Sequence, residues 1–83
     1  MPVYTYERVP VQVQALRYDG GNMEELKSFA GDDIQTMADG EPYVYTLEGT
    51  MIISVGDYVV KGIKGEFYPV KPAIFAKIYK MIG

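Results

Sequence analysis

The chain has 83 residues, carries a formal net charge of −3 and contains neither cysteine nor histidine. A chain of this length corresponds to one domain with a single modest core, so we expect one domain over residues 1–83. Without cysteine it forms no disulfide, thiolate metal site or thiol nucleophile, and without histidine it lacks the commonest general base and transition-metal ligand. This composition predicts a protein that is not an enzyme and has no cofactor.

The charges are unevenly distributed along the chain. Residues 1–57 carry three basic and ten acidic side chains, whereas residues 58–83 carry five lysines and a single glutamate. Such asymmetry produces a basic face that attracts anions, unless the fold mixes the two halves on one surface. No apolar run has the length of a signal-peptide core or a membrane span, which predicts a soluble, intracellular protein without a membrane partner.

Alternating valines near the N-terminus predict the first strand. Val9, Val11 and Val13 alternate with a proline and glutamines, which is the period of a half-buried strand, and we expect the strand to continue to Tyr18. Because proline donates no ladder hydrogen bond, this strand should begin near Pro10 or lie at a sheet edge.

A short amphipathic helix is predicted from Asn22 to Ala30. Asn22 suits the N-cap, Glu25 stands at the capping-box position, and Gly31 suits a left-handed C′ position. A helix this short is marginal alone, so its apolar stripe must pack on a sheet. Residues 34–37 form a weaker strand candidate.

The second half of the chain is rich in strand candidates. Residues 43–47 alternate and lead into a turn at Glu48-Gly49. Gly56-Asp57 and residues 62–65 are short breaks between apolar runs, so three successive strands should form an antiparallel meander. These three strands are residues 51–55, 58–61 and 66–70.

The segment after Pro72 has apolar residues at helical spacing, and proline suits the first helical position. The predicted fold class is therefore α+β. It has four to six mostly antiparallel strands in a small curved sheet, open or closed into a barrel, with one helix near residues 22–30 and a helical turn after Pro72. Because so small a chain buries a limited core, we also expect a homo-oligomer built by edge pairing.

The stretch GDYVVKGIKGEFYPVKPAIFAKIYK resembles the C-terminal signature of a widespread family of small proteins encoded by bacteriophages and prophages. The resemblance continues upstream through PVQVQALRY, DGGNMEEL and TLEGTM, in that order, and covers nearly the whole chain. The chain departs from the family pattern at Val70, where a cysteine is common, and at Ala73 and Ala76, where acids are common. The resemblance implies a phage or prophage origin and a location in the cytoplasm of the bacterial host, and it brings no catalytic residues.

Acids and serines are the remaining candidates for catalysis. Glu24-Glu25 and Asp32-Asp33 lie in a helix first turn and in a loop, without the alternating ligand spacing of a calcium site. Ser28 and Ser54 have no histidine to activate them. Capping and solvation explain these acids, so no metal site is expected, and a small carboxylate-dependent enzyme is a minority alternative.

Aromatic and basic residues interleave in the C-terminal part of the chain. On alternating strand positions Tyr58 faces opposite to Lys61, and Phe67 opposite to Tyr68, so one face can be core while the other presents rings and ammonium groups. Such a surface can stack a base and neutralise phosphates. The alternative is that the rings are packed and the lysine stems cover them. The candidate ligand-binding residues are Tyr58, Lys61, Lys64, Phe67, Tyr68 and Lys71.

The sequence favours a non-enzymatic, phage-encoded binding protein. Its expected partner is a host protein or a small anionic, nucleotide-like ligand, and a counter-defence role fits such a binder. The net acidity argues against extended duplex DNA. A structural or accessory virion component, associating through strand edges and aromatic patches, is the main alternative.

Overall fold

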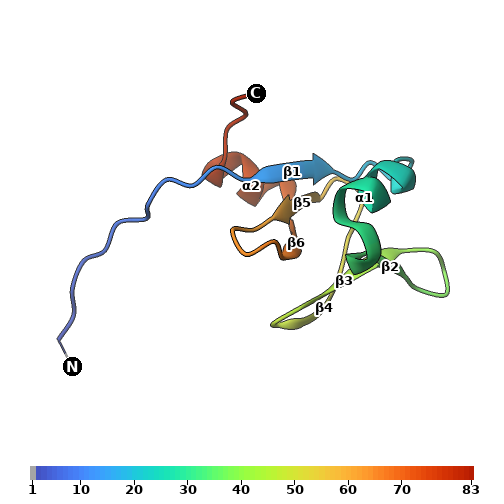
Figure 1. Cartoon of the computed structure of the whole chain (residues 1–83), viewed down its shortest axis with the longest axis horizontal. Helices are drawn as coiled ribbons and strands as arrows, with labels where there is room; N and C mark the ends of the chain where they lie inside the picture. The colour runs from blue at the N-terminus through green and yellow to red at the C-terminus, as the bar shows by residue number, and fades with distance from the viewer. Residues whose placement is uncertain (1) are drawn as a thin grey trace.

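A computed structural model, which describes residues 2–83, has two helices and six strands in an α+β arrangement (Figure 1). The strands form two antiparallel three-stranded sheets, in the orders β1-β5-β6 and β2-β3-β4, and neither sheet closes into a barrel within residues 2–83. The predicted fold class is confirmed. The strands are β1 (Gln14–Arg17), β2 (Gln35–Thr36), β3 (Pro42–Thr46), β4 (Gly49–Ile52), β5 (Tyr58–Lys61) and β6 (Phe67–Val70). The two α-helices are α1 (Met23–Ala30) and α2 (Pro72–Ile78), and a 3-10 turn, η1 (Gly31–Asp33), follows α1.

The predicted helix is confirmed, with Asn22 at its N-cap position, but the Asn22 side chain does not make the expected capping hydrogen bond. Its Oδ1 accepts a hydrogen bond from the Asp19 N–H at 2.9 Å, and its Nδ2 donates to the Arg17 carbonyl at 2.8 Å, so the side chain ties the turn before α1 and makes no cap bond. A single amide can satisfy a donor and an acceptor of this tight turn at once. Gly31 has a positive φ of 60°, as predicted, but its ψ of −137° lies outside the left-handed helical region.

The predicted three-strand meander is wrong at Gly56-Asp57. β4 pairs with β3, and β5 pairs with β1 and β6, so these two residues connect different sheets. Residues 54–57 form a turn in which Gly56 has a φ of 97° and the Asp57 N–H donates to the Ser54 carbonyl at 3.0 Å. The Tyr18 N–H donates to the Asp57 carbonyl, and the Gly56 N–H to the Tyr18 carbonyl, which aligns β5 with β1. The hairpin between β5 and β6 is confirmed.

The first strand is shorter than predicted. It starts at Gln14, whose partner Lys61 is the last residue of β5, so the β5–β6 hairpin offers nothing to pair with the residues before Gln14. Residues 2–13, the arm, leave the body of the molecule as an extended segment (Figure 1). The predicted edge position is confirmed, because β1 is the outer strand of its sheet.

The core lies between the inner faces of the two sheets and α1. Leu26 of α1, Val44 of β3 and Val59 of β5 are almost fully buried there, and each such side chain stabilises the fold by about 1.5–3 kcal/mol. The opposite face of the β1-β5-β6 sheet carries α2, and Val60 is fully buried on that side. Neither helix of residues 2–83 is long and apolar enough to cross a bilayer.

Candidate binding surface

The strand register separates the six predicted ligand-binding residues. Tyr58 pairs with Val70, and Val60 with Tyr68, so these four side chains share the face that carries α2. Lys61 pairs with Phe67 on the other face. The alternation expected from the sequence is therefore present, but both faces of the sheet are covered, one by the core and the other by α2.

Phe67 belongs to the core. It is 9% exposed, and its ring meets Phe29 of α1 edge to face, with centroids 5.3 Å apart and planes at 79°. This geometry suits the ring quadrupoles and fixes α1 against the sheet. The register and the burial of Phe67 place it away from Tyr58 and Tyr68.

Lys71 is held by Asp57, which sequence reasoning did not single out. Asp57 is 2% exposed; its Oδ1 and Oδ2 accept hydrogen bonds from Lys71 Nζ at 3.1 and 3.2 Å, and Oδ2 also accepts from the Ser54 N–H at 2.9 Å. A buried carboxylate is tolerated here because it is paired and hydrogen-bonded. A Gly-Asp pair between two apolar runs indicates a turn, and no local signal indicated this ion pair.

Tyr58 and Tyr68 form an aromatic cluster with α2. The Tyr58 ring stacks on Phe75 with centroids 3.9 Å apart, and Phe75 in turn contacts Tyr79 at 4.9 Å. Burial, with a hydrogen bond to the Tyr79 side chain as the second cause, raises the pKa of Tyr68 to about 12. These contacts attach α2, a helix too short to be stable alone, to the sheet.

Lys61 and Lys64 are the exposed members of the predicted set. Lys61 ends β5, and Lys64 lies in the turn before β6, where its N–H donates to Glu66 Oε1 at 3.0 Å. Their ligand-binding role stays a prediction. A ligand there would meet two exposed lysines without the rings, because Phe67 is in the core and Tyr58 and Tyr68 lie on the opposite face with α2.

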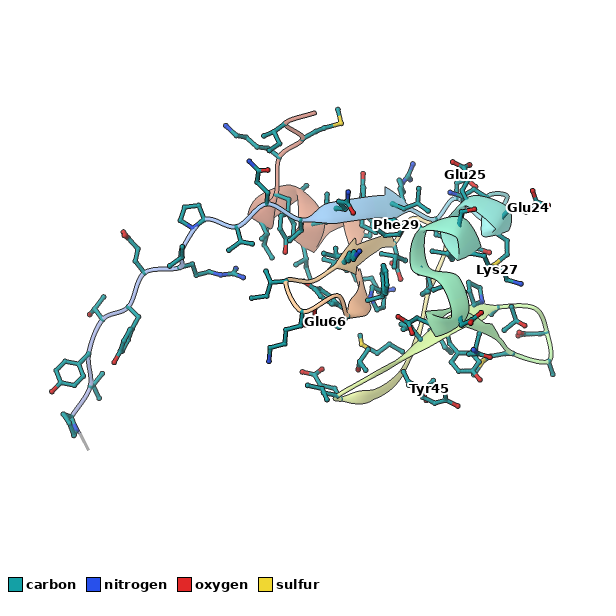
Figure 2. The ribbon with its side chains drawn as sticks, viewed as in Figure 1. Glu24, Glu25, Lys27, Phe29, Tyr45 and Glu66 are labelled. Carbon is teal, nitrogen blue, oxygen red and sulfur yellow. The ribbon has the colours of Figure 1, made fainter. Side chains whose placement is uncertain are left out.

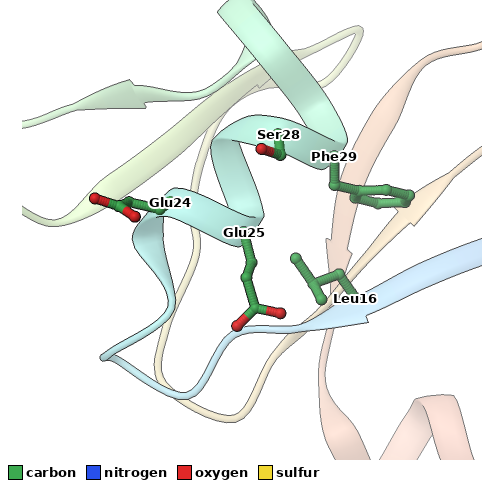
Figure 3. A pocket seen from close by; sticks show the side chains of 5 residues that line it. All are labelled: Leu16, Glu24, Glu25, Ser28 and Phe29. Atoms are coloured by element: carbon green, nitrogen blue, oxygen red, sulfur yellow. The ribbon is translucent and has the colours of Figure 1, made fainter.

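Two shallow hollows lie elsewhere on the molecule, and none of the six residues lines them. The first, between α1 and β1, has Leu16 and Phe29 on one side and the Glu25 carboxylate beside them (Figure 3). Glu24 projects from the other side of α1 in the same view. The second hollow is lined by Thr36, Met37, Ala38, Tyr43, Tyr45 and Thr50.

The second hollow lies on the outer face of the β2-β3-β4 sheet, which we call the tyrosine face. Tyr43 pairs with Ile52 and with Gln35, and Tyr45 pairs with Thr50, so these five side chains share one side of the sheet. The two tyrosine rings meet edge to face with centroids 5.4 Å apart. Tyr45 is 68% exposed and projects away from the body of the molecule (Figure 2).

A hydrogen bond between the two side chains, helped by desolvation, raises the pKa of Tyr43 above its ordinary value. Acids flank the tyrosine face at Asp39, Glu41 and Glu48. Between these acids, the surface presents the exposed ring of Tyr45, the half-buried ring of Tyr43 and an exposed aliphatic side chain, Ile52. Alternation over residues 43–47 predicted a strand, and no sequence signal singled out this surface.

No group of three or more metal-ligating side chains comes together within the described part of the chain.

No family model, curated protein or solved structure matches the chain.

Proposed function

We propose that this chain is a phage-encoded, non-enzymatic binding protein that engages a host protein in the bacterial cytoplasm through the tyrosine face. The observation that supports this most directly is the Tyr43–Tyr45 pair beside a hollow, in which Tyr45 is exposed and Tyr43 is half-buried. Tyrosine is enriched at protein interfaces, since it brings a large rigid ring and a polar hydroxyl at low entropic cost. A structural sheet face needs no such rings in water.

The negative charge around the tyrosine face indicates that the partner's surface is basic at its rim. Asp39, Glu41 and Glu48 stand on turns at the ends of its strands, and residues 1–57 are strongly acidic as a whole. A partner with an apolar centre and a basic rim complements this arrangement. The shallow hollow suits an inserted aliphatic or aromatic side chain better than an enclosed small molecule.

Site-specific photo-crosslinking in the bacterial host tests the proposal. Benzoylphenylalanine replaces Tyr45, and in a matched control it replaces Ile63, which is 76% exposed on the turn between β5 and β6. We expect one host polypeptide to crosslink to position 45 and not to position 63. Equal crosslinking from both positions, or none from position 45, contradicts the proposal.

A small anionic ligand is the second candidate, and the exposed Lys61 and Lys64 favour it. The double substitution Lys61→Glu with Lys64→Glu should then abolish uptake of a phosphorus-containing ligand observed by native mass spectrometry. Unchanged uptake removes this candidate. Detection of the chain in purified phage particles would instead favour a virion component.

A further inference from the structure

The backbone hydrogen bonds of Tyr18 fix the orientation of every residue in β1. Both the N–H and the C=O of Tyr18 point toward the turn before β5. Backbone N–H and C=O groups alternate in direction along an antiparallel strand. Those of Leu16 and Gln14 therefore also point toward β5, whereas those of Arg17 and Ala15 point outward, away from the sheet. Continued into the extended arm, this alternation turns Val13, Val11 and Val9 outward as well.

The outward edge of β1 and the arm therefore keeps all its donors. Pro10 and Pro2 belong to the alternate residues whose backbone groups point to the β5 side. The N–H groups that proline lacks are therefore not missing from the outward edge. The outer edge of β6 differs. The Gly62 N–H donates to the Glu66 carbonyl, so alternation turns Pro69 outward, where it has no N–H to offer. Of the two outer edges of this sheet, only that of β1 suits a further strand.

The side chains along this edge favour a second copy of the chain as the partner strand. Identical strands related by a two-fold axis pair antiparallel and satisfy each other's free groups. In such a pair, each hydrogen-bonded position joins two residues whose backbone N–H and C=O groups point outward. This condition allows the two-fold axis to pass through Val11, Gln12 or Val13 near the middle of the segment. Of these three, only the register centred on Gln12 places Glu7 opposite Arg17.

The same register matches the remaining side chains. Val9 lies opposite Ala15, and Val11 opposite Val13, so the exposed valines of the arm (Val9 78% and Val11 50%) gain apolar neighbours. Arg8 lies opposite Leu16. The contact thus pairs one set of opposite charges, Glu7 with Arg17, and two sets of apolar side chains.

We propose that two copies of the chain pair antiparallel through residues 7–17, with Gln12 on the two-fold axis, to form a continuous six-stranded sheet. The strand pair is about 37 Å long at roughly 3.4 Å per residue. Tyr4 and Tyr6 extend beyond it toward the partner's β1–α1 turn and add about 150–250 Å² of contact each, toward the roughly 800 Å² per partner of stable complexes. The tyrosine face stays free in this dimer.

Cysteine crosslinking tests the register, since the natural chain has no cysteine. Residues facing each other in a non-bonded antiparallel pair have Cα atoms about 4.5 Å apart, within disulfide range. We expect Gln12→Cys to give a disulfide-linked dimer under mild oxidation. Gln14→Cys, the matched control on the same face, places the two sulfurs about 13 Å apart along the strands and should stay unlinked.

Charge reversal tests the same contact without a covalent bond. Analytical ultracentrifugation of the full chain should show a dimer that Glu7→Arg or Arg17→Glu weakens about 10-fold. The double variant should recover the wild-type dissociation constant, and circular dichroism should show that all three are folded. A monomeric wild type at 100 µM overturns the proposal. So does a dimer that crosslinks equally at positions 12 and 14, or one that the charge reversals leave unchanged.

Discussion

Lys71 Nζ reaches both carboxylate oxygens of Asp57, at 3.1 and 3.2 Å, and so joins the start of α2 to the turn that connects the two sheets. The two partners differ in burial, because the Lys71 side chain is 61% exposed and that of Asp57 only 3%. The ion pair itself therefore contributes little, whereas the carboxylate is needed for the Ser54 N–H.

Asp57→Ala is expected to lower the free energy of unfolding by about 2 kcal/mol, because it leaves a part-buried N–H without its acceptor. Lys71→Met should cost less than about 1 kcal/mol. Urea denaturation followed by circular dichroism measures both. Asp57→Asn, which keeps an acceptor oxygen, should fall between them, and equal losses for Asp57→Ala and Lys71→Met would contradict this assignment.

Phe67→Ala is expected to destabilise the chain by about 3–5 kcal/mol, since it opens a cavity against Phe29, and Phe67→Leu by about 1 kcal/mol. Thermal and urea unfolding provide the measurement. The control is Tyr45→Ala on the exposed tyrosine face, which should change stability by no more than about 0.5 kcal/mol. A Phe67→Ala variant as stable as the control would show that this ring is not part of the core.

Alkaline pH should destabilise the fold through Tyr68, whose pKa is raised to about 12 from an ordinary 10.0. The unfolded chain loses this proton first, so the stability associated with the neutral phenol is complete below pH 10 and is lost as the pH rises to about 12. Melting temperatures between pH 9 and 12 should fall less steeply for Tyr68→Phe than for the wild type.

Tyr79→Phe separates the two largest causes of that shift, burial and the hydrogen bond to Tyr79. It removes the hydrogen-bond partner of Tyr68 but leaves the burial, which is the larger cause, so most of the alkaline loss should persist. If Tyr79→Phe flattens the pH dependence as fully as Tyr68→Phe does, the hydrogen bond is the dominant cause.

Gly56→Ala is expected to cost about 1–3 kcal/mol, because Gly56 has a φ of 97° in the turn between the sheets. Gly21→Ala is the matched control: the backbone there has no positive φ, and an added Cβ would lie 3.6 Å from Asp19 Oδ1, an ordinary contact. Chemical denaturation of the pair compares them, and similar losses would exclude backbone strain as the reason.

Local patterns in the sequence predicted most of the elements. The strand Tyr58–Lys61 and the helices after Asn22 and at Pro72 follow from composition, spacing and proline position, which act within a few residues. The connection at Gly56-Asp57 was predicted wrongly because the same turn can join strands of one sheet or of two. Its outcome depends on hydrogen bonds with Tyr18, a residue far away along the chain.

The candidate surface was harder to predict for a related reason. The interleaved aromatic and lysine residues show which residue types are close in sequence. They do not show that Phe29 packs on Phe67 or that Asp57 forms an ion pair with Lys71. Both contacts come from elements that pack together only in the tertiary structure. The tyrosine face was missed, because alternation in residues 43–47 predicts a strand but does not show which of its side chains are exposed.

The route of the chain through its two sheets also sets an order for folding during synthesis. β1 leaves the ribosome first, yet its partner β5 follows about 40 residues later, after the whole β2-β3-β4 sheet. At roughly 5–20 residues per second, the outer strand and the apolar arm spend seconds unpaired while the local β3–β4 hairpin can already form. A nascent chain stalled before Tyr58 should therefore be the species most in need of a chaperone.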